Sequence, residues 1–291
     1  MALTINTNVS SLVAQKNLNK ATAALNSSIE RMSTGSKINH AGDNAAGYAI
    51  AKNWETQLGS LDVAADNAAT GADMLTTLED TYSLVSTHLQ RVRDLTEQAA
   101  NGTYGEDSLK AIEAEITSRL QEIDRISANC EFNGKKLMTG AGTGAITADL
   151  NIQVGLYSDA NSKITLSSTL FASSSSKSLF GGSDEIAAIA KKCSGQQSGV
   201  TAASMLTTID NALKTINDRN TKIGAAQNRI DSAIESIAVQ SENITSSLST
   251  LRDADIASES SSYIRSQILQ QAASTLLATA NQSPSIALNL I

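Results

Sequence analysis

The sequence contains few bulky aromatic residues and almost no proline. Aromatic residues make up 3% of its 291 positions, and Pro284 is its one proline. A compact domain of this length would be poorly filled without large aromatic side chains. Alanine, serine, threonine and asparagine are abundant instead, and they suit slim helices that pack along their lengths. The composition therefore favours long paired helices over a compact globule.

The chain also has too few cysteines and histidines for a disulfide framework or a metal centre. Its cysteines are Cys130 and Cys193, and its histidines are His40 and His88. Two cysteines do not make a disulfide framework, so we expect free thiols, with a single pairing as the alternative. Neither histidine has a cysteine or a second histidine at ligand spacing. We therefore expect no metal and no other cofactor.

Charge and hydropathy argue against nucleic-acid binding and against a membrane protein. The net charge is −7, and the lysine pairs 135–136 and 191–192 are isolated rather than part of a basic patch. No uninterrupted apolar run approaches the ~18 residues that a membrane-spanning helix requires. The N-terminal residues lack the positive region, apolar core and cleavage motif of a secretory signal peptide. Taken alone, these features would indicate a cytoplasmic protein.

The second half of the chain carries a long heptad-like pattern. Between Leu206 and Leu251, apolar residues recur at alternating steps of three and four. An average step of three and a half is typical of a coiled-coil seam. At ~1.5 Å per residue, one helix over this segment would be roughly 70 Å long. A single helix of that length needs partners to cover its seam, so we expect it to assemble with other helices.

The first half of the chain carries matching patterns. Apolar residues alternate in the same way over 61–92, and Asn101-Gly102 predicts the end of that helix. Asp107-Ser108 is expected to cap a following helix over 109–126. Further helices are expected over 5–32 and 256–280. Helices at both termini and in both halves predict a mainly α fold, a long antiparallel bundle whose ends meet.

The segment from 139 to 199 lacks the helical period. Leu150, Ile152 and Val154 alternate as in a strand, and Ile164 and Leu166 do so after an intervening turn. These two runs predict a small β-hairpin, and residues 184–192 one short helix. The segment is too short for a good core of its own. We expect it to be an insert at the outer tip of the bundle.

Four segments stand in the order that is diagnostic of one protein family. They lie at 29–51, 89–103, 115–134 and 267–284. They include Ile29-Glu-Arg-Met-Ser-Thr-Gly-Ser-Lys-Ile-Asn39, Leu89-Gln-Arg-Val-Arg-Asp-Leu95 and Gln267-Ile-Leu-Gln-Gln-Ala272. Together with the opening Thr4-Ile-Asn-Thr-Asn8, they resemble bacterial flagellin, the subunit of the flagellar filament.

The resemblance covers about residues 1–140 and 200–291, and it implies a domain division. Residues 1–44 and 253–291 would form a terminal coiled-coil inner domain, and 45–140 with 200–252 a helical bundle domain. Residues 141–199 would be a short variable insert in place of the large outer domains of many flagellins. The chain therefore resembles a minimal flagellin that has only the two inner domains.

The segment that joins the inner and outer helices would be about 34–47. Its glycines at 35, 42 and 47 are expected to supply bends. The cysteines are unusual for the family, and Asp43-Asn44 replaces an acidic pair that is common there.

The resemblance implies a structural protein that self-assembles into a helical homopolymer for swimming motility. The apolar faces of the end helices would order and become buried between subunits. The expected polymerisation residues are Leu18, Leu25, Ile29, Ile264, Ile268 and Leu276.

The implied location is extracellular, after export by the flagellar secretion apparatus without a cleaved signal peptide. This overturns the cytoplasmic inference. The implied partners are other copies of the chain, hook–filament junction proteins, a filament cap protein and a cytoplasmic export chaperone that holds about residues 258–291.

Two further sites follow from the resemblance. Leu89, Gln90, Arg91, Leu95 and Glu115 match positions at which the vertebrate Toll-like flagellin receptor recognises the monomer; subunit contacts are the alternative role. The hydroxyl groups of residues 173–176 are candidate O-glycosylation sites, with a plain flexible loop as the alternative. These four residues are Ser173, Ser174, Ser175 and Ser176.

Two other functions remain as alternatives. Some flagellins carry a metallopeptidase, but its H-E-x-x-H motif is missing here, so we expect no enzyme activity. The other alternative is a hook–filament junction protein, which shares end helices with flagellin. The motifs around Arg91 and at 267–272 favour flagellin.

Overall fold

The computed structural model describes residues 8–101, 103–180 and 202–288, the last range without the side chains of 202–204 and 283–288. Within these ranges the protein is mainly helical, which confirms the predicted fold class. It divides into two compact units, one formed by residues 1–58 and 241–291 and the other by residues 59–240. The expected short helix at 184–192 lies outside the described residues. We refer to the two parts as the terminal unit and the central unit.

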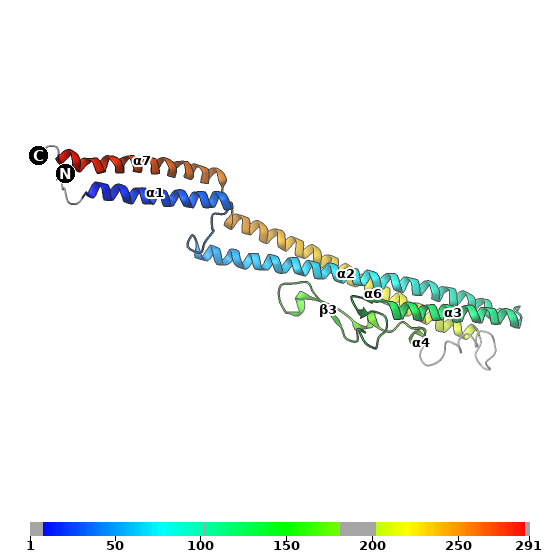
Figure 1. Ribbon diagram of the computed structural model, residues 1–291. Coiled ribbons are helices and arrows are strands. Elements are labelled where there is room, and N and C mark those ends of the chain that lie inside the picture. Colours follow the sequence, from blue (N-terminus) through cyan, green and yellow to red (C-terminus); the bar gives the residue numbers. More distant parts are fainter. Residues whose placement is uncertain (1–7, 102, 181–201, 289–291) are drawn as a thin grey trace. The chain divides into compact units, whose positions relative to one another are not determined.

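Five long helices account for most of the described chain (Figure 1). They are α1 (Val9–Thr34), α2 (Ala45–Ala100), α3 (Glu106–Asn129), α6 (Ala202–Arg252) and α7 (Ile256–Leu288). The strands are β1 (Glu131–Phe132), β2 (Lys135–Lys136), β3 (Leu150–Gln153) and β4 (Lys163–Leu166). Short helical turns η1 (Ala160–Ser162), η2 (Ser168–Phe171) and α4 (Ser176–Leu179) complete the elements with described bounds.

The helix ends follow local sequence signals, with one exception. The Asn8 side chain caps α1 by accepting a hydrogen bond from the Ser11 backbone N–H at 3.1 Å. Gly35 ends α1 in the left-handed region, at φ 70°. Helix α2 ends at Ala100, as Asn101-Gly102 predicts. The predicted cap at Asp107-Ser108 is wrong. Helix α3 begins at Glu106 with Gly105 as N-cap. Asp107 lies in the first turn, where its negative charge interacts favourably with the positive end of the helix dipole.

The core of the central unit is formed where the predicted apolar stripes of α2, α3 and α6 meet. Helix α2 contributes residues from Ala68 to Leu95, α3 from Ile112 to Ile126 and α6 from Met205 to Ile230. Large aliphatic side chains at steps of three and four fall on one face of each helix, so each stripe covers the others along its length. Fully buried members include Leu75, Leu78, Leu89, Ile116, Leu120, Ile123, Ile209, Ile216 and Ile223.

Strands β3 and β4 form the predicted antiparallel hairpin, with Ile152 opposite Ile164. The hairpin packs against the side of α2 rather than at the end of the bundle (Figure 1). Its Ile152 side chain lies over Gly71, where an added Cβ would come within 2.5 Å of Ile152 Cδ1. The absence of a side chain at Gly71 therefore permits this close approach.

Polar side chains from three helices hold the segment 170–176 against the bundle. Tyr82 Oη of α2 donates a hydrogen bond to the Leu170 carbonyl at 2.7 Å, and both groups are buried. Arg219 Nη1 of α6 donates to Ser174 Oγ at 2.6 Å. The Asp124 carboxylate of α3 accepts from Ser176 N and Ser176 Oγ, at 2.7 and 2.9 Å. We call this set the polar clasp.

The segment that follows α1 is folded back onto the end of α6. The Lys37 N–H donates to the Arg252 carbonyl at 2.7 Å, and the Ala254 N–H donates to the Gly35 carbonyl at 2.8 Å. Gly35 supplies a bend, as predicted. The prediction for Gly47 is wrong, because it lies inside α2, where an added Cβ would come within 2.9 Å of Ile38 Cδ1. Its role there is close packing rather than a bend.

Cys130 is a free, buried thiol that lies 3.5 Å from Thr81 Oγ1. Burial raises the pKa of this thiol, because the charged thiolate is poorly solvated there. Its possible partner Cys193 lies outside the described residues.

Replacing Tyr82 with phenylalanine should lower the free energy of unfolding by about 1–3 kcal/mol, because the buried Leu170 carbonyl loses its donor. Urea titration followed by circular dichroism measures this change. Tyr157→Phe removes the same hydroxyl from a side chain that is 66% exposed and should have little effect. Equal stability of the two variants would contradict a structural role for the polar clasp.

In a chain carrying Cys193→Ser, the Cys130 thiol should react with a soluble disulfide reagent about ten-fold more slowly when folded than in concentrated urea. The physical reason is its burial and raised pKa. The absorbance of the released thiolate measures the rate, and a free cysteine peptide is the control. Equal rates in both solvents would contradict the buried position.

Candidate functional site

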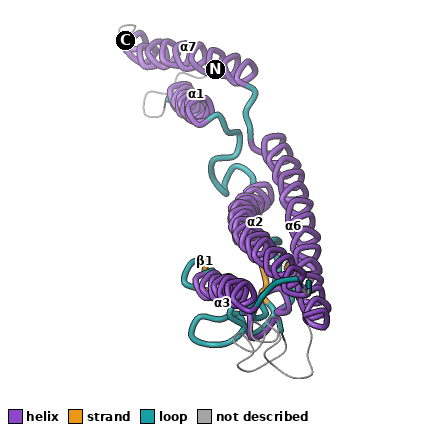
Figure 2. The backbone as a smooth tube through the Cα atoms, turned by 90° about the vertical axis from the view of Figure 1, so that its right-hand side faces the viewer, coloured by secondary structure: helices purple, strands orange, loops and turns teal. Residues whose placement is uncertain are grey.

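Helices α1 and α7 run antiparallel in the terminal unit (Figure 1), and Figure 2 shows them as adjacent helices. Asn8 Nδ2 donates a hydrogen bond to the Ala280 carbonyl at 2.7 Å, and Ser11 Oγ donates to Asn281 Oδ1 at 2.6 Å. Gln270 Nε2 also donates to Thr22 Oγ1 at 3.2 Å. These contacts set the register along the pair and confirm that the two ends of the chain meet.

The contact between α1 and α7 is made by small side chains. Among the described side chains of these two helices, the buried ones are Ala21 and Ser28 of α1 and Ser266 and Ala273 of α7. Small side chains let two helix backbones approach closely, but they bury little apolar area. The pair therefore gains little of the hydrophobic stabilisation that a coiled-coil seam of leucine and isoleucine provides.

Most of the large aliphatic side chains of the same two helices point outward. Nine of them are between 47% and 63% exposed. Isolated exposed apolar residues are common on soluble proteins, but a dense set on two adjacent helices marks an interaction surface. These residues are distributed around the sides of α1 and α7 that do not face each other, and we call them together the outer aliphatic face: Val9, Leu12, Val13, Ile29, Ile256, Ile264, Ile268, Leu269 and Leu276.

Four of the six expected polymerisation residues belong to this face, namely Ile29, Ile264, Ile268 and Leu276. The other two, Leu18 and Leu25, are half-buried. The sequence interpretation assigned no assembly role to the remaining five residues of the face. Three of these five, Val9, Leu12 and Leu269, lie in the apolar pattern of their helices. That pattern does not tell which side of a helix faces outward.

A shallow hollow of about 400 Å³ lies along the contact between α1 and α7. Alanines make up half of its lining, which also includes Leu269 and Leu276. Because small residues leave space between the helices, an apolar side chain from another molecule can enter there. Leu269 and Leu276 belong both to the lining of the hollow and to the outer aliphatic face, so the two adjoin each other.

A group of ion pairs joins α2 to α6 within the terminal unit. Glu55 of α2 pairs with Arg252 at the end of α6, and with Lys52 at 2.7 Å. The hydrogen bond from Lys52 lowers the pKa of Glu55, and the charges of Lys52 and Arg252 act in the same direction. These contacts join the first turns of α2 to the last turn of α6 within this unit.

The residues expected to contact a receptor fall into two groups. Leu89 and Leu95 are buried in the core of the central unit, so they are not available to a partner of the folded chain. Gln90 and Arg91 are exposed on α2. Arg91 Nε lies 3.0 Å from Glu115 Oε1 of α3, so the structure brings these two charged residues together.

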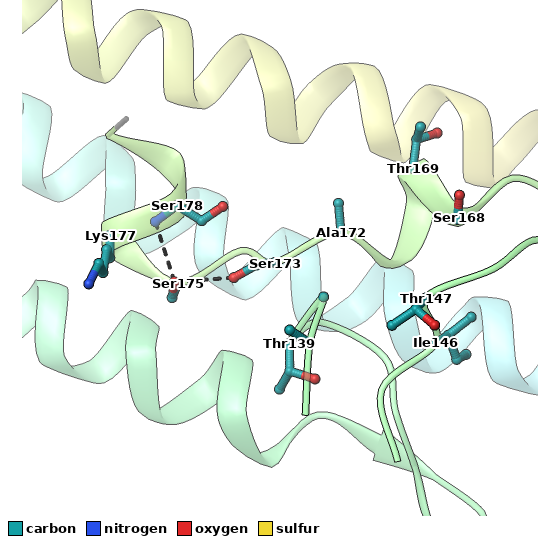
Figure 3. A pocket seen from close by; sticks show the side chains of 12 residues that line it. Thr139, Ile146, Thr147, Ser168, Thr169, Ala172, Ser173, Ser175, Lys177 and Ser178 are labelled. Carbon is teal, nitrogen blue, oxygen red and sulfur yellow. Dashed lines mark hydrogen bonds between the residues drawn. The ribbon is translucent and has the colours of Figure 1, made fainter. Parts of the chain in front are cut away.

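The serine run at 173–176 is part of the folded central unit. Ser174 and Ser176 are 0% exposed and belong to the polar clasp, so neither hydroxyl can accept a sugar in the folded chain. Ser173 and Ser175 are half-buried, and their hydroxyls lie 3.2 Å apart at the edge of a hollow (Figure 3). The alternative expectation of a plain flexible loop is wrong, because hydrogen bonds from three helices fix this segment.

Among the described residues, no helix is both long and apolar enough to cross a membrane. The same part of the chain contains no group of three or more histidine, cysteine or acidic residues that could hold a metal ion.

Comparisons with known proteins cover nearly the whole chain. The family model described as the bacterial flagellin N-terminal helical region matches residues 5–143, and the model of the bacterial flagellin C-terminal helical region matches residues 206–291. The chain is 36% identical to a flagellin of Xenorhabdus nematophila over the full length of both chains. It is 32% identical to a flagellin of Bacillus subtilis over 99% of both chains.

A solved structure has a similar fold. A putative flagellar hook-associated protein from Vibrio parahaemolyticus superimposes with a TM-score of 0.61, over 72% of this chain and 100% of that chain. Its sequence is only 14% identical, so this likeness concerns the fold alone. The two family models and the full-length relatives decide the identity: the chain belongs to the bacterial flagellin family, and it is a structural subunit of the flagellar filament rather than an enzyme.

Proposed function

We propose that the outer aliphatic face of α1 and α7 is the surface through which this subunit is built into the filament. The observation that carries the proposal is the inverted arrangement of the pair, with small residues inside and nine large aliphatic residues outside. The described part of the monomer leaves these side chains exposed, whereas neighbouring copies can cover them. The expected polymerisation residues Ile29, Ile264, Ile268 and Leu276 are part of this surface, and Leu18 and Leu25 border it.

The magnitude of the hydrophobic contribution supports this proposal. Full burial of a large aliphatic side chain contributes roughly 1.5–3 kcal/mol. Because the nine residues are already about half covered, their complete burial would contribute on the order of 10 kcal/mol. Association and the ordering of side chains cost an appreciable part of that amount. A single contact would therefore be weak, and repeated contacts with several neighbours would be needed for a stable polymer.

The domain division expected from the resemblance is part of the same proposal. Residues 1–44 and 253–291 would form the inner domain that carries the aliphatic face. Residues 45–140 and 200–252 would form the second domain, with 141–199 as its insert. Contacts between unlike surfaces of identical subunits generate an open helical filament when they do not close into a ring.

Further partners are proposed on the basis of the family resemblance. The subunit would leave the cell through the flagellar secretion apparatus without a cleaved signal peptide. It would contact hook–filament junction proteins at the filament base and a cap protein at its tip. An exposed aliphatic face on α7 would need cover before export, which supports a cytoplasmic chaperone bound over about residues 258–291.

Recognition of the monomer by the Toll-like flagellin receptor is also proposed. Gln90, Arg91 and Glu115 would make the direct contacts, because Leu89 and Leu95 are buried and would act only by shaping the helix. Arginine suits such an anchor, since its guanidinium combines a planar donor fork with packing surface.

The alternative role of a hook–filament junction protein has less support. The Vibrio parahaemolyticus structure carries the name of a putative flagellar hook-associated protein, but at 14% identity its likeness concerns the fold alone. A purified subunit that binds filament ends and blocks further growth would favour this alternative.

Replacing Ile268 with glutamine should slow elongation of filament seeds about ten-fold, a factor that corresponds to ~1.4 kcal/mol per contact. Ile268 is 60% exposed in the monomer, so its replacement should leave the fold intact. Light scattering and electron microscopy of seeded reactions measure the growth. Tyr157→Gln changes a similarly exposed side chain on the insert and should elongate normally. Growth of the Ile268 variant at the unchanged rate would exclude this face from the subunit interface.

Replacing Arg91 with alanine should reduce receptor signalling by purified monomer about ten-fold. Arg93→Ala is the matched control, because Arg93 lies on the same helix and forms a comparable ion pair, with Asp210 at 2.7 Å. A reporter cell line that carries the receptor provides the measurement, and circular dichroism confirms that both variants are folded. If Arg91→Ala signalled like the unaltered chain, the receptor assignment would be dropped.

A further inference from the structure

The outward side of α2 carries a row of acidic residues. Asp62, Asp66, Asp73 and Asp80 follow one another at steps of four, seven and seven. Since 3.6 residues make one helical turn, all four lie on nearly the same line along α2. This line is opposite the buried stripe that contains Leu75 and Leu78. All four residues are exposed, and the described part of the chain provides no ion-pair partner for any of them.

The outward side of α6 carries basic residues at a similar spacing. Lys214, Lys222 and Arg229 are exposed and lie at steps of eight and seven. Lys214 lies opposite the buried stripe that contains Ile216 and Ile223, and Lys222 and Arg229 lie beside that stripe, about 100–120° around the helix from it. Within the described ranges, none of the three lies within ion-pair distance of an acidic group. Asp218 lies between Lys214 and Lys222 on the same side, and it lowers the local excess of positive charge without removing it.

The two rows do not neutralise each other within one chain. Helices α2 and α6 share one core; the acidic row lies opposite it on α2, the basic row lies opposite or beside it on α6, and no ion pair joins the two rows among the described residues. A pairing of the rows therefore requires two molecules. Steps of seven residues correspond to about 10.5 Å along a helix, so Asp66, Asp73 and Asp80 have nearly the same separation as the basic residues.

We infer that the acidic row on α2 docks on the basic row on α6 of a second copy of this chain. This inference rests on the proposed filament function and adds a second, electrostatic contact to the aliphatic one. The two faces are different, so the contact is heterologous and repeats from copy to copy. Exposed ion pairs are individually weak, but a row of them sets the register of two helices and speeds their encounter.

Charge reversal in seeded elongation tests the inference. An acid-reversed chain carries Asp66→Lys and Asp73→Lys, and a base-reversed chain carries Lys222→Glu and Arg229→Glu. Each should elongate unaltered seeds about five-fold more slowly at low ionic strength, and the defect should shrink at high salt because screening weakens the repulsion. A chain with all four reversals should add slowly to unaltered seeds at first. Once copies of that chain cover the seed end, each new copy meets a complementary row, and most of the elongation rate should return.

The control chain carries Asp231→Lys and Glu235→Lys, which are exposed on α6 outside the basic row and change the net charge as much as the acid reversal does. It should elongate like the unaltered chain. Elongation of the acid-reversed chain at the control rate, or a defect that the combined reversal leaves unrepaired, would overturn the docking of these two rows.

The same experiment separates this inference from the proposal on which it rests. If Ile268→Gln slowed growth while both charge-reversed chains grew normally, the aliphatic interface would stand and the docking of the rows would be wrong. If the unaltered chain failed to elongate seeds, the proposed filament interface would be wrong, and this inference would fall with it. Circular dichroism of each monomer before mixing confirms that it is folded.

Discussion

The shared aliphatic seam of α2, α3 and α6 is the constraint on which the rest of the central unit depends. Aliphatic residues at steps of three and four, such as Leu78, Ile116 and Ile216, cover one another where the three helices meet. This seam makes a bulky aromatic core unnecessary, which explains how a chain with 3% aromatic residues can fold. It also directs the opposite side of each helix toward solvent, where charged residues collect.

The terminal unit uses the reverse arrangement, and its function depends on that difference. Ala21, Ser28, Ser266 and Ala273 lie between α1 and α7, while the large aliphatic residues lie outside. A pair built in this way is held in register by hydrogen bonds such as the one from Asn8 to Ala280. Its exposed aliphatic side chains, however, stay in water and contribute little to the stability of the monomer. Association with further copies can supply that contribution, so the unit has the properties expected of a subunit that reaches its full stability in a polymer.

The polar clasp gives the central unit a specificity that the aliphatic seam lacks. Leucine and isoleucine stripes tolerate shifts along the helix axes, because one aliphatic contact resembles the next. Tyr82, Asp124 and Arg219 form hydrogen bonds with particular groups on the segment 170–176. Buried hydrogen bonds are costly when unmade, so they fix the insert at one position on the bundle.

The sequence by itself determined which residues form helices, which form the hairpin and to which family the chain belongs. Those features depend on local periodicity, on turn residues such as Asn101-Gly102 and on long motifs, all of which can be read along the chain. Tertiary structure alone decided that Leu89 and Leu95 are buried beside the exposed Arg91, that Gly47 serves packing, and that Ser174 and Ser176 are inaccessible. It also decided that the aliphatic residues of α1 and α7 face outward. Periodicity places residues on a common side of a helix, but only the neighbouring helices determine whether that side is covered.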